Sequence, residues 1–147
     1  AFEKLLTGWQ VRRDLRLDFG LTKTIAQLTE TLYPSASPIR SQIGQVPEWM
    51  ISTGAMWSPF SRLDLSIRIK SWPTYWNNTA HSVVNDGATI TDVYANFRLN
   101  HRVSLYGMVQ NAGNIAYLDQ GSQGTGTAPY RGQPLRINAG VRLNLGR

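Results

Sequence analysis

The chain of 147 residues is long enough for one domain, and its lack of cysteine excludes a disulfide framework and any Cys-based metal site. Hydrophobic residues make up 41% of it, yet no apolar run approaches the ~18–20 residues that a membrane-spanning helix needs. The net charge of +6 comes from basic residues scattered along the chain, whereas nucleic-acid binding usually needs a basic cluster or stripe, so we expect no nucleic-acid partner.

Apolar and polar residues alternate in seven stretches, and this alternation predicts β-strands because successive side chains of a strand point to opposite faces. The first four predicted strands span residues 3–12, 15–26, 48–58 and 62–75. In the fourth, an apolar row opposes a polar row: Leu63, Leu65, Ile67 and Ile69 against Asp64, Ser66, Arg68 and Lys70.

The last three predicted strands span residues 90–100, 103–117 and 135–145. The final strand alternates almost without fault, with Leu135, Ile137, Ala139, Val141, Leu143 and Leu145 on one face. Its roughly eleven residues exceed the ~5–6 usual in soluble sheets and match the ~9–11 that a tilted strand needs to cross a bilayer. No segment shows a convincing helical period, so the sequence predicts an all-β chain.

The predicted connections alternate in length. Short turns fall at residues 13–14, 59–61 and 101–102, and long connections at residues 27–47, 76–89 and 118–134. Short turns on one rim and long loops on the other are typical of outer-membrane barrels, whose periplasmic turns are short. A soluble β-sandwich has no reason to sort its connections in this way.

The face opposite the apolar one carries charge on strand after strand, which favours a wet lumen on that side and lipid on the other. Its charged residues, six basic and three acidic, are Arg16, Asp18, Asp64, Arg68, Lys70, Asp92, Arg98, Arg136 and Arg142. We interpret Asp64 and Asp92 as partners of nearby arginines such as Arg68 and Arg98. The basic excess suits an anionic cargo such as a ferric chelate, and plain solvation of a lumen explains it equally well.

Two tryptophans of the apolar face, Trp49 and Trp57, lie eight residues apart. At ~3.3 Å rise and ~40° tilt this is roughly 20 Å along the membrane normal, close to the ~25 Å apolar band between two aromatic girdles. We therefore interpret Trp9, Trp49 and Trp57 as membrane-interface aromatics. The alternative interpretation is that they are core tryptophans of a soluble barrel.

Aromatic residues also gather at the outer strand ends and in the long connections, where they either anchor the membrane interface or line the mouth where a ligand first lands. With one loop histidine they form the candidate substrate-binding set: Trp72, Tyr75, Trp76, His81, Tyr117 and Tyr130. The two histidines, His81 and His101, lie at opposite rims, and no catalytic or phosphate-loop motif occurs. We expect no enzyme activity, no cofactor and no metal site.

Several short motifs occur in an order and spacing that resemble the C-terminal barrel of TonB-dependent outer-membrane receptors, best over residues 46–145. Val46-Pro47 stands just ahead of the third strand, and residues 91–100 are similar to a later downward strand of the family. Asn111, Asn114 and Tyr117 fit an Asn-Leu-Phe-Asp type motif closed by Tyr, with Ala112 and Gly113 replacing its large apolar pair. Gly132-Gln133-Pro134 resembles the Gly-x-Pro-Arg motif before the last strand, with one residue inserted ahead of Arg136.

The resemblance implies an antiparallel up-and-down transmembrane β-barrel segment, about seven strands of a larger barrel of about 22 strands with a plugged lumen. Residues 1–147 would form the C-terminal β-barrel segment, with the plug domain and signal peptide absent. Alone, this segment would leave two unpaired edges in lipid, so we expect it not to work as a transporter by itself.

The function implied is uptake of a scarce nutrient, most often a ferric siderophore, across the outer membrane of a Gram-negative bacterium. The inner-membrane protein TonB would supply the energy through the missing plug. One alternative is a passive porin-type channel. Another is a soluble lipocalin-like or avidin-like ligand-binding β-barrel, in which the apolar face would line the inside.

Overall fold

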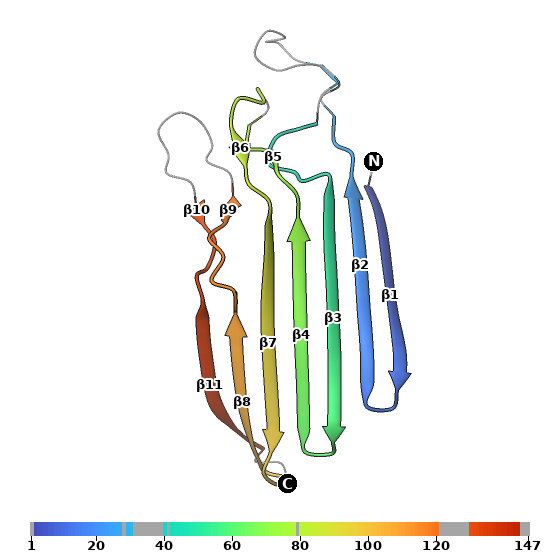
Figure 1. The fold of residues 1–147 in the computed structure, drawn as a ribbon, viewed down its shortest axis with the longest axis vertical. Helices are drawn as coiled ribbons and strands as arrows, with labels where there is room; N and C mark the ends of the chain where they lie inside the picture. The colour runs from blue at the N-terminus through green and yellow to red at the C-terminus, as the bar shows by residue number, and fades with distance from the viewer. Residues whose placement is uncertain are drawn as a thin grey trace.

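The computed structural model describes residues 2–27, 29–30, 40, 42–78, 80–120 and 130–144. Its main feature is a seven-stranded antiparallel sheet in which every strand pairs with the next long strand of the chain (Figure 1). The strands, in their order across the sheet, are β1 (Phe2–Arg12), β2 (Leu15–Thr24), β3 (Trp49–Phe60), β4 (Leu63–Trp72), β7 (Ala88–Arg98), β8 (Val103–Gln110) and β11 (Arg136–Leu143). The described residues form no helix, so the all-β, up-and-down prediction is confirmed.

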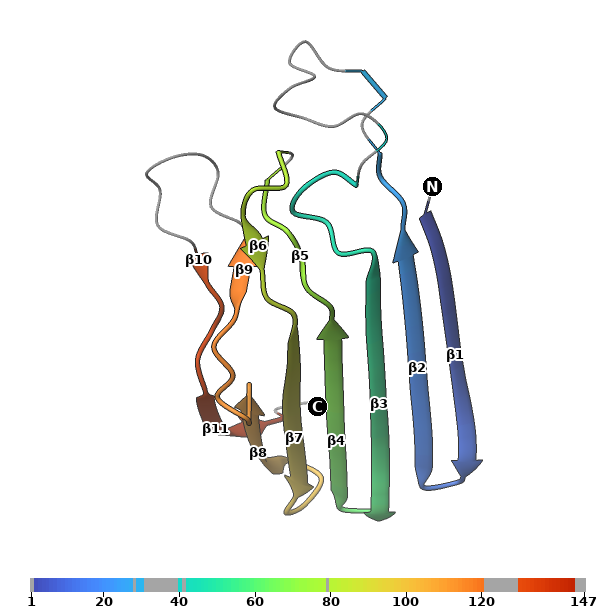
Figure 2. The same cartoon turned by 45° about the horizontal axis from the view of Figure 1, so that its top comes forward.

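The connections are sorted between the two ends of the sheet, as predicted (Figures 1 and 2). The short turns, at residues 13–14, 61–62 and 99–102, all lie at one end, called here the short-turn end. The long connections lie at the opposite, long-loop end. Two small ribbons that the sequence did not predict extend there: β5 (Tyr75–Trp76) with β6 (Val84–Asn85), and β9 (Leu118–Gln120) with β10 (Tyr130–Arg131).

The strand register keeps most apolar residues on one face of the sheet and most charged residues on the other. Ile67 pairs with Ala55 on one side and Val93 on the other, while its neighbour Arg68 pairs with Gly54 and Asp92. Because the side-chain period is two, this register brings apolar positions together on one face. That face is uncovered, and Ala88 and Ile90 are the only buried hydrophobic residues of the described chain.

Three strand ends differ from the prediction because backbone chemistry interrupts the ladder. β4 ends at Trp72 rather than at residue 75, since Pro73 has no N–H to donate. β8 ends at Gln110 rather than at residue 117, since Asn111 turns the chain with a φ of 48°. β2 ends at Thr24, two residues early, where its backbone N–H still bonds to the carbonyl of Glu48.

Smaller differences concern the turns. Pro59 and Phe60 belong to β3 rather than to a turn, and a bulge between Trp57 and Phe60 absorbs the irregularity. β7 is displaced by two residues, beginning at Ala88 and ending at Arg98. Leu145, the predicted last residue of the final strand, lies outside the described residues.

The outer edges of β1 and β11 pair with no other strand of the described chain. Each edge therefore presents a row of backbone groups free to pair with a further strand. None of the described residues belongs to a helix long and apolar enough to cross a membrane.

Candidate functional site

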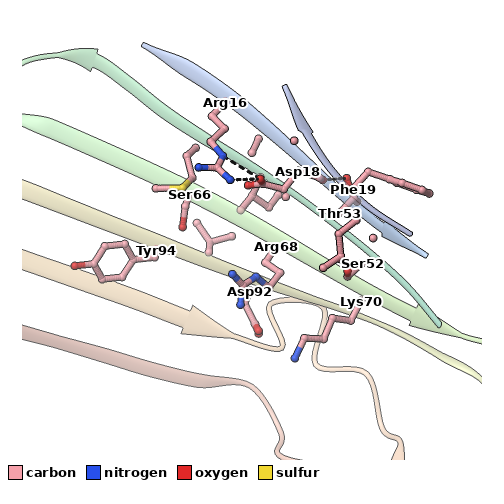
Figure 3. A pocket seen from close by; sticks show the side chains of 18 of the residues that line it. Arg16, Asp18, Phe19, Ser52, Thr53, Ser66, Arg68, Lys70, Asp92 and Tyr94 are labelled. Atoms are coloured by element: carbon pink, nitrogen blue, oxygen red, sulfur yellow. Dashed lines mark hydrogen bonds and ion pairs between the residues drawn. The ribbon is translucent and has the colours of Figure 1, made fainter. Parts of the chain in front are cut away.

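The polar face of the sheet is hollowed, and Figure 3 shows the side chains that line the hollow. The hollow has a volume of about 960 Å³ and runs over β1, β2, β3, β4, β7 and β8. The charged side chains in its lining are Arg16, Asp18, Arg68, Lys70 and Asp92. The concave side of the sheet is thus the charged side, and most of the exposed apolar side chains lie on the other face, while Leu6, Met50 and Met56 share the charged face.

Ion pairs along and across the strands hold part of this charge in place. Arg16 bonds Asp18 at 3.0 Å within β2, as Figure 3 shows. Arg98 on β7 bonds Asp64 on β4 at 3.0 Å, and Asp64 also accepts a 2.8 Å hydrogen bond from the Ser58 hydroxyl. The predicted pairing of Asp64 with a nearby lumen arginine is therefore present.

Asp92 does not follow the same prediction. Its carboxylate accepts the backbone N–H of Asn111 at 2.9 Å, although Arg68 is its register partner on β4. Within the described residues, no ion pair engages Arg68 or Lys70. The hollow therefore contains two basic side chains, Arg68 and Lys70, that form no ion pair in the described part of the chain, and its net charge is positive.

A second, smaller pocket opens at the long-loop end of the same face, with a volume of about 470 Å³. Three predicted site residues line it together: Trp72, Tyr75 and Tyr117. The rings of Trp72 and Tyr117 meet edge to face, with centroids 5.6 Å apart and an interplanar angle of 72°. This geometry is the favoured one for an aromatic pair.

The position of Tyr117 depends on close backbone approach. A Cβ on Gly132 would lie 2.0 Å from the Tyr117 ring, so only glycine fits there. The Gly132 N–H also donates to the Tyr117 carbonyl at 2.8 Å. The Gly132 and Tyr117 positions of the sequence motif thus hold each other in place.

Polar residues complete this pocket: Gln45, Lys70, Asp92, Gln110, Asn111 and Gln133. The sequence placed Lys70 and Asp92 on the charged face and Asn111 in a motif, but it predicted none of the six as a ligand-binding residue. Lys70 and Asp92 also line the larger hollow, so the two cavities adjoin each other and share these two charged side chains. Gln45 and Gln133 come from long connections, and no periodic pattern marks residues of that kind.

Two other predicted site residues form a separate pair away from this pocket lining. Trp76 and His81 stack with ring centroids 5.0 Å apart and planes 4° apart. The His81 Nε2 lies 2.6 Å from the carbonyl oxygen of Gln42, and the Gln45 N–H donates to the Trp76 carbonyl at 2.6 Å. His81 therefore joins two long connections rather than standing free in a solvated loop. Tyr130 lies in β10, and its side chain is outside the described residues.

The predicted interface aromatics lie on the apolar face at its two ends. Trp9, Trp49 and Trp57 are 54%, 39% and 46% exposed. At the short-turn end, the Trp57 indole N–H donates to the Asp14 carboxylate at 3.2 Å. At the other end, the Lys23 ammonium lies 4.9 Å from the Trp49 ring centroid. Each of these two tryptophans thus combines an exposed ring with a charged partner, the arrangement that suits a boundary between water and lipid.

The described residues bring no three histidine or carboxylate side chains together as a group able to hold a metal ion. The arrangement supplies instead a charged hollow, an aromatic pocket above it and an exposed apolar face behind it.

No protein-family model and no curated protein matches this sequence. Solved structures do match its fold. BauA, the ferric preacinetobactin receptor from Acinetobacter baumannii, shares 22% identity over 97% of this chain, with a TM-score of 0.79. The siderophore receptor PiuA from the same organism shares 13% identity over 95% of this chain, with a TM-score of 0.80.

The ferric-catecholate import receptor Fiu of E. coli K12 matches as well, with 12% identity, 95% coverage and a TM-score of 0.77. The chain spans about a fifth of the length of these structures: 21%, 21% and 20%. At these identities the likeness concerns the fold. The seven-stranded sheet therefore has the architecture of a segment of a larger barrel.

Proposed function

We propose that this chain is the C-terminal barrel segment of a TonB-dependent receptor that takes up a ferric siderophore, or a similar scarce nutrient, across the bacterial outer membrane. The observation that carries the proposal is the pairing of an uncovered apolar face with a charged, hollow face on one sheet. The likeness to three siderophore receptors supports it.

The membrane part of the proposal follows from burial. Ile67, Val93 and Leu105 lie on three successive strands of one face, and their side chains are 40%, 36% and 42% exposed. A soluble protein would cover such a continuous apolar face, because large exposed apolar patches mark contact surfaces. Lipid would cover the apolar side chains, and water in the hollow would solvate the charged ones. The backbone N–H and C=O groups at the outer edges of β1 and β11 would pair with further strands of the barrel.

The cargo part rests on the long-loop pocket and the charge beneath it. Trp72, Tyr75 and Tyr117 offer aromatic surface, and Lys70 offers a cation between the pocket and the hollow. Aromatic rings and a cation suit a ligand that is both aromatic or planar and anionic, as many iron chelates are. Tyr130, Trp76 and His81 belong to the same long-loop end and would shape the approach to the pocket.

In this proposal the segment catalyses no reaction and is not an enzyme. It supplies wall, outer loops and part of the binding vestibule, while a plug domain and the inner-membrane protein TonB supply gating and energy. The predicted absence of a cofactor fits that division, because the iron arrives as cargo.

The proposal is tested on the complete protein that contains this chain. A panel of ferric siderophores is titrated against the purified receptor, and the tightest ligand is then measured with Trp72→Ala and Tyr117→Ala. Loss of one ring of an aromatic binding pair is expected to weaken binding about tenfold or more. Trp9→Ala is the matched control, since Trp9 is exposed on the apolar face and does not line the pocket. Unchanged affinity in the Trp72 and Tyr117 variants contradicts the assignment of this pocket.

The two alternatives give different results. A passive porin-type channel takes up its solute equally with and without TonB, whereas the proposed receptor loses uptake in a tonB-deficient strain. A soluble lipocalin-like or avidin-like barrel is recovered without detergent. It would also need its hollow on the apolar face, whereas the hollow here is lined by charged side chains.

A further inference from the structure

The two ends of the sheet carry different charge. The three short turns, with Arg12 just ahead of the first, carry four arginines and one carboxylate: Arg12, Arg13, Arg62, Arg102 and Asp14. The neighbouring Arg98–Asp64 ion pair adds no net charge. The long-loop end carries a nearly balanced set, Lys4, Lys23, Arg40 and Arg131 with Glu3, Glu30, Glu48, Asp86 and Asp119. The short-turn end is therefore the positive end of the sheet.

Three of these arginines are available for a partner. The described chain provides no hydrogen bond or ion pair to the guanidinium of Arg13, Arg62 or Arg102, and all three residues are exposed. Only Arg12 is engaged, with the Asp14 carboxylate at 3.1 Å. The arginine row, defined here as Arg13, Arg62 and Arg102, is thus exposed and has guanidinium donors without a partner among the described residues.

The arginine row follows the rim of the sheet. Its members occupy the β1–β2, β3–β4 and β7–β8 turns, one to each turn (Figure 1). Successive turns lie two strands apart, or about 10 Å at the usual ~4.8 Å between strands. A single compact ligand would need the three guanidinium groups close together. Arginines spaced along the rim match instead a row of separate lipid headgroups.

The depth of the row relative to the apolar face is fixed by Trp57. Its indole N–H donates to Asp14 at 3.2 Å, so the β1–β2 turn lies level with the tryptophan that ends the apolar face. Arg13 is next to Asp14 in that turn, and Arg62 lies in the turn that follows the strand of Trp57. The row therefore lies where lipid headgroups would meet the protein.

We propose that the arginine row binds the phosphate groups of anionic glycerophospholipids, such as phosphatidylglycerol, in the leaflet at the short-turn end. The guanidinium fork matches phosphate oxygens in a bidentate manner. One arginine close to an anionic headgroup is expected to favour that lipid about fivefold over a zwitterionic one. The inference rests on the proposed function only in that the strands span a bilayer.

The experiment uses the complete protein that contains this chain, reconstituted in vesicles with the same lipid mixture in both leaflets. Since the chain has no cysteine, Ser61→Cys places one fluorophore beside Arg62, with any cysteine elsewhere in the protein replaced. Quenching is compared for phosphatidylglycerol and phosphatidylcholine that carry a nitroxide on the acyl chain near the headgroup. The triple variant Arg13→Gln, Arg62→Gln, Arg102→Gln removes the row.

Two matched variants separate charge from position. Lys4→Gln, Arg40→Gln, Arg131→Gln removes the same charge from the long-loop end, and Arg13→Lys, Arg62→Lys, Arg102→Lys keeps the charge of the row. The expected result is an about fivefold preference for phosphatidylglycerol that is lost in the row-to-glutamine variant, kept in the long-loop control, and weaker in high salt. The lysine variant keeps part of the preference.

Equal quenching by both lipids in the unmodified protein overturns the proposal, and so does a preference that survives loss of the row. Failure of the membrane assignment gives a different result: the protein then stays out of the floated vesicles, and no nitroxide lipid quenches the fluorophore.

Discussion

The side-chain amide of Asn111 donates a 2.9 Å hydrogen bond to the backbone carbonyl of Gln133, 22 residues further along the chain. The same amide nitrogen donates to the Ile115 carbonyl at 2.8 Å, and its oxygen accepts the Ile115 N–H at 2.9 Å. Asn111 is 2% exposed and has a φ of 48°. One buried side chain therefore ends β8 and fixes the segment that leads into β11.

Asn111→Ala should destabilise the folded protein strongly. The substitution removes three buried side-chain hydrogen bonds and leaves a left-handed φ that a residue with a plain Cβ disfavours. At about 1 kcal/mol for each bond the loss is about 3 kcal/mol. The measurement is the temperature at which the compact, folded band of the complete protein disappears from a detergent gel.

Asn114→Ala is the matched control for this variant. Asn114 has a similar φ of 47° but is exposed, and its side chain accepts one bond, from the Leu135 N–H at 3.0 Å. We expect a loss of about 1 kcal/mol. Equal melting temperatures for the two variants would contradict the central role assigned to Asn111.

Gly140→Ala should destabilise the pairing of β8 with β11. A Cβ on Gly140 would lie 2.6 Å from the Tyr106 hydroxyl oxygen and 2.7 Å from its ring, because Tyr106 packs across the strand onto the glycine. Tyr106 would have to leave this position, and with it the contact in which Arg142 lies 5.9 Å from its ring centroid. We expect a cost of about 1–3 kcal/mol, as for other overpacked sites, measured on the same gel assay.

Gly107→Ala offers a control on the adjacent strand. A Cβ on Gly107 would meet nothing within 4 Å, and Gly107 pairs with Ala139 rather than with an aromatic residue. Its melting temperature should stay unchanged or rise slightly, since alanine reduces the freedom of the unfolded chain. A larger loss for Gly107→Ala than for Gly140→Ala would show that packing of Tyr106 does not set the stability of this pair of strands.

The sequence predicted the long strands and their faces because a period of two is a local signal that does not need tertiary information. The Asp64–Arg98 pair was also predictable, since both residues lie on the polar face of strands close in the chain. The partner of Asp92 was not, because the Asn111 N–H is offered only once β8 has ended in a left-handed turn.

The pocket at the long-loop end was predicted in part. Trp72 and Tyr117 were singled out as aromatics at strand ends, but their edge-to-face contact depends on the approach of Gly132 from 15 residues further along. Gln45 and Gln133 were missed because long connections carry no periodicity from which a direction can be read.

Ile67→Arg and Ser66→Arg test which face meets lipid, because the two residues are neighbours on opposite faces of β4. Ile67 is 40% exposed and shares the apolar face with Ala55 and Val93, whereas the register places Ser66 on the charged face beside Tyr94. An arginine in the middle of a lipid-facing strand costs about 2–4 kcal/mol, so under the proposed function Ile67→Arg should reduce the amount of folded protein in the membrane fraction. Ser66→Arg should leave that amount nearly unchanged, as the hollow is wet.

The reverse result would contradict the membrane assignment. If the apolar face were exposed to water, Ile67→Arg would keep or raise the yield of folded protein, because it replaces an exposed hydrophobic side chain by a charged one. Substituting both residues with alanine separates the effect of charge from loss of the original side chain.

His81→Ala should loosen the long connections at the long-loop end. His81 stacks on Trp76 and lies 2.6 Å from the carbonyl oxygen of Gln42, so its loss releases the segment that contains Gln42. Local opening of that segment should make trypsin cleave after Arg40 about tenfold faster under native conditions, since opening of a loop governs its proteolysis.

His101→Ala, at the short-turn end, removes the other histidine of the chain and should leave cleavage at Arg40 unchanged. Equal cleavage rates for His81→Ala and the unmodified protein would mean that the remaining contacts, such as the Gln45 N–H to the Trp76 carbonyl at 2.6 Å, hold the two connections together without the histidine.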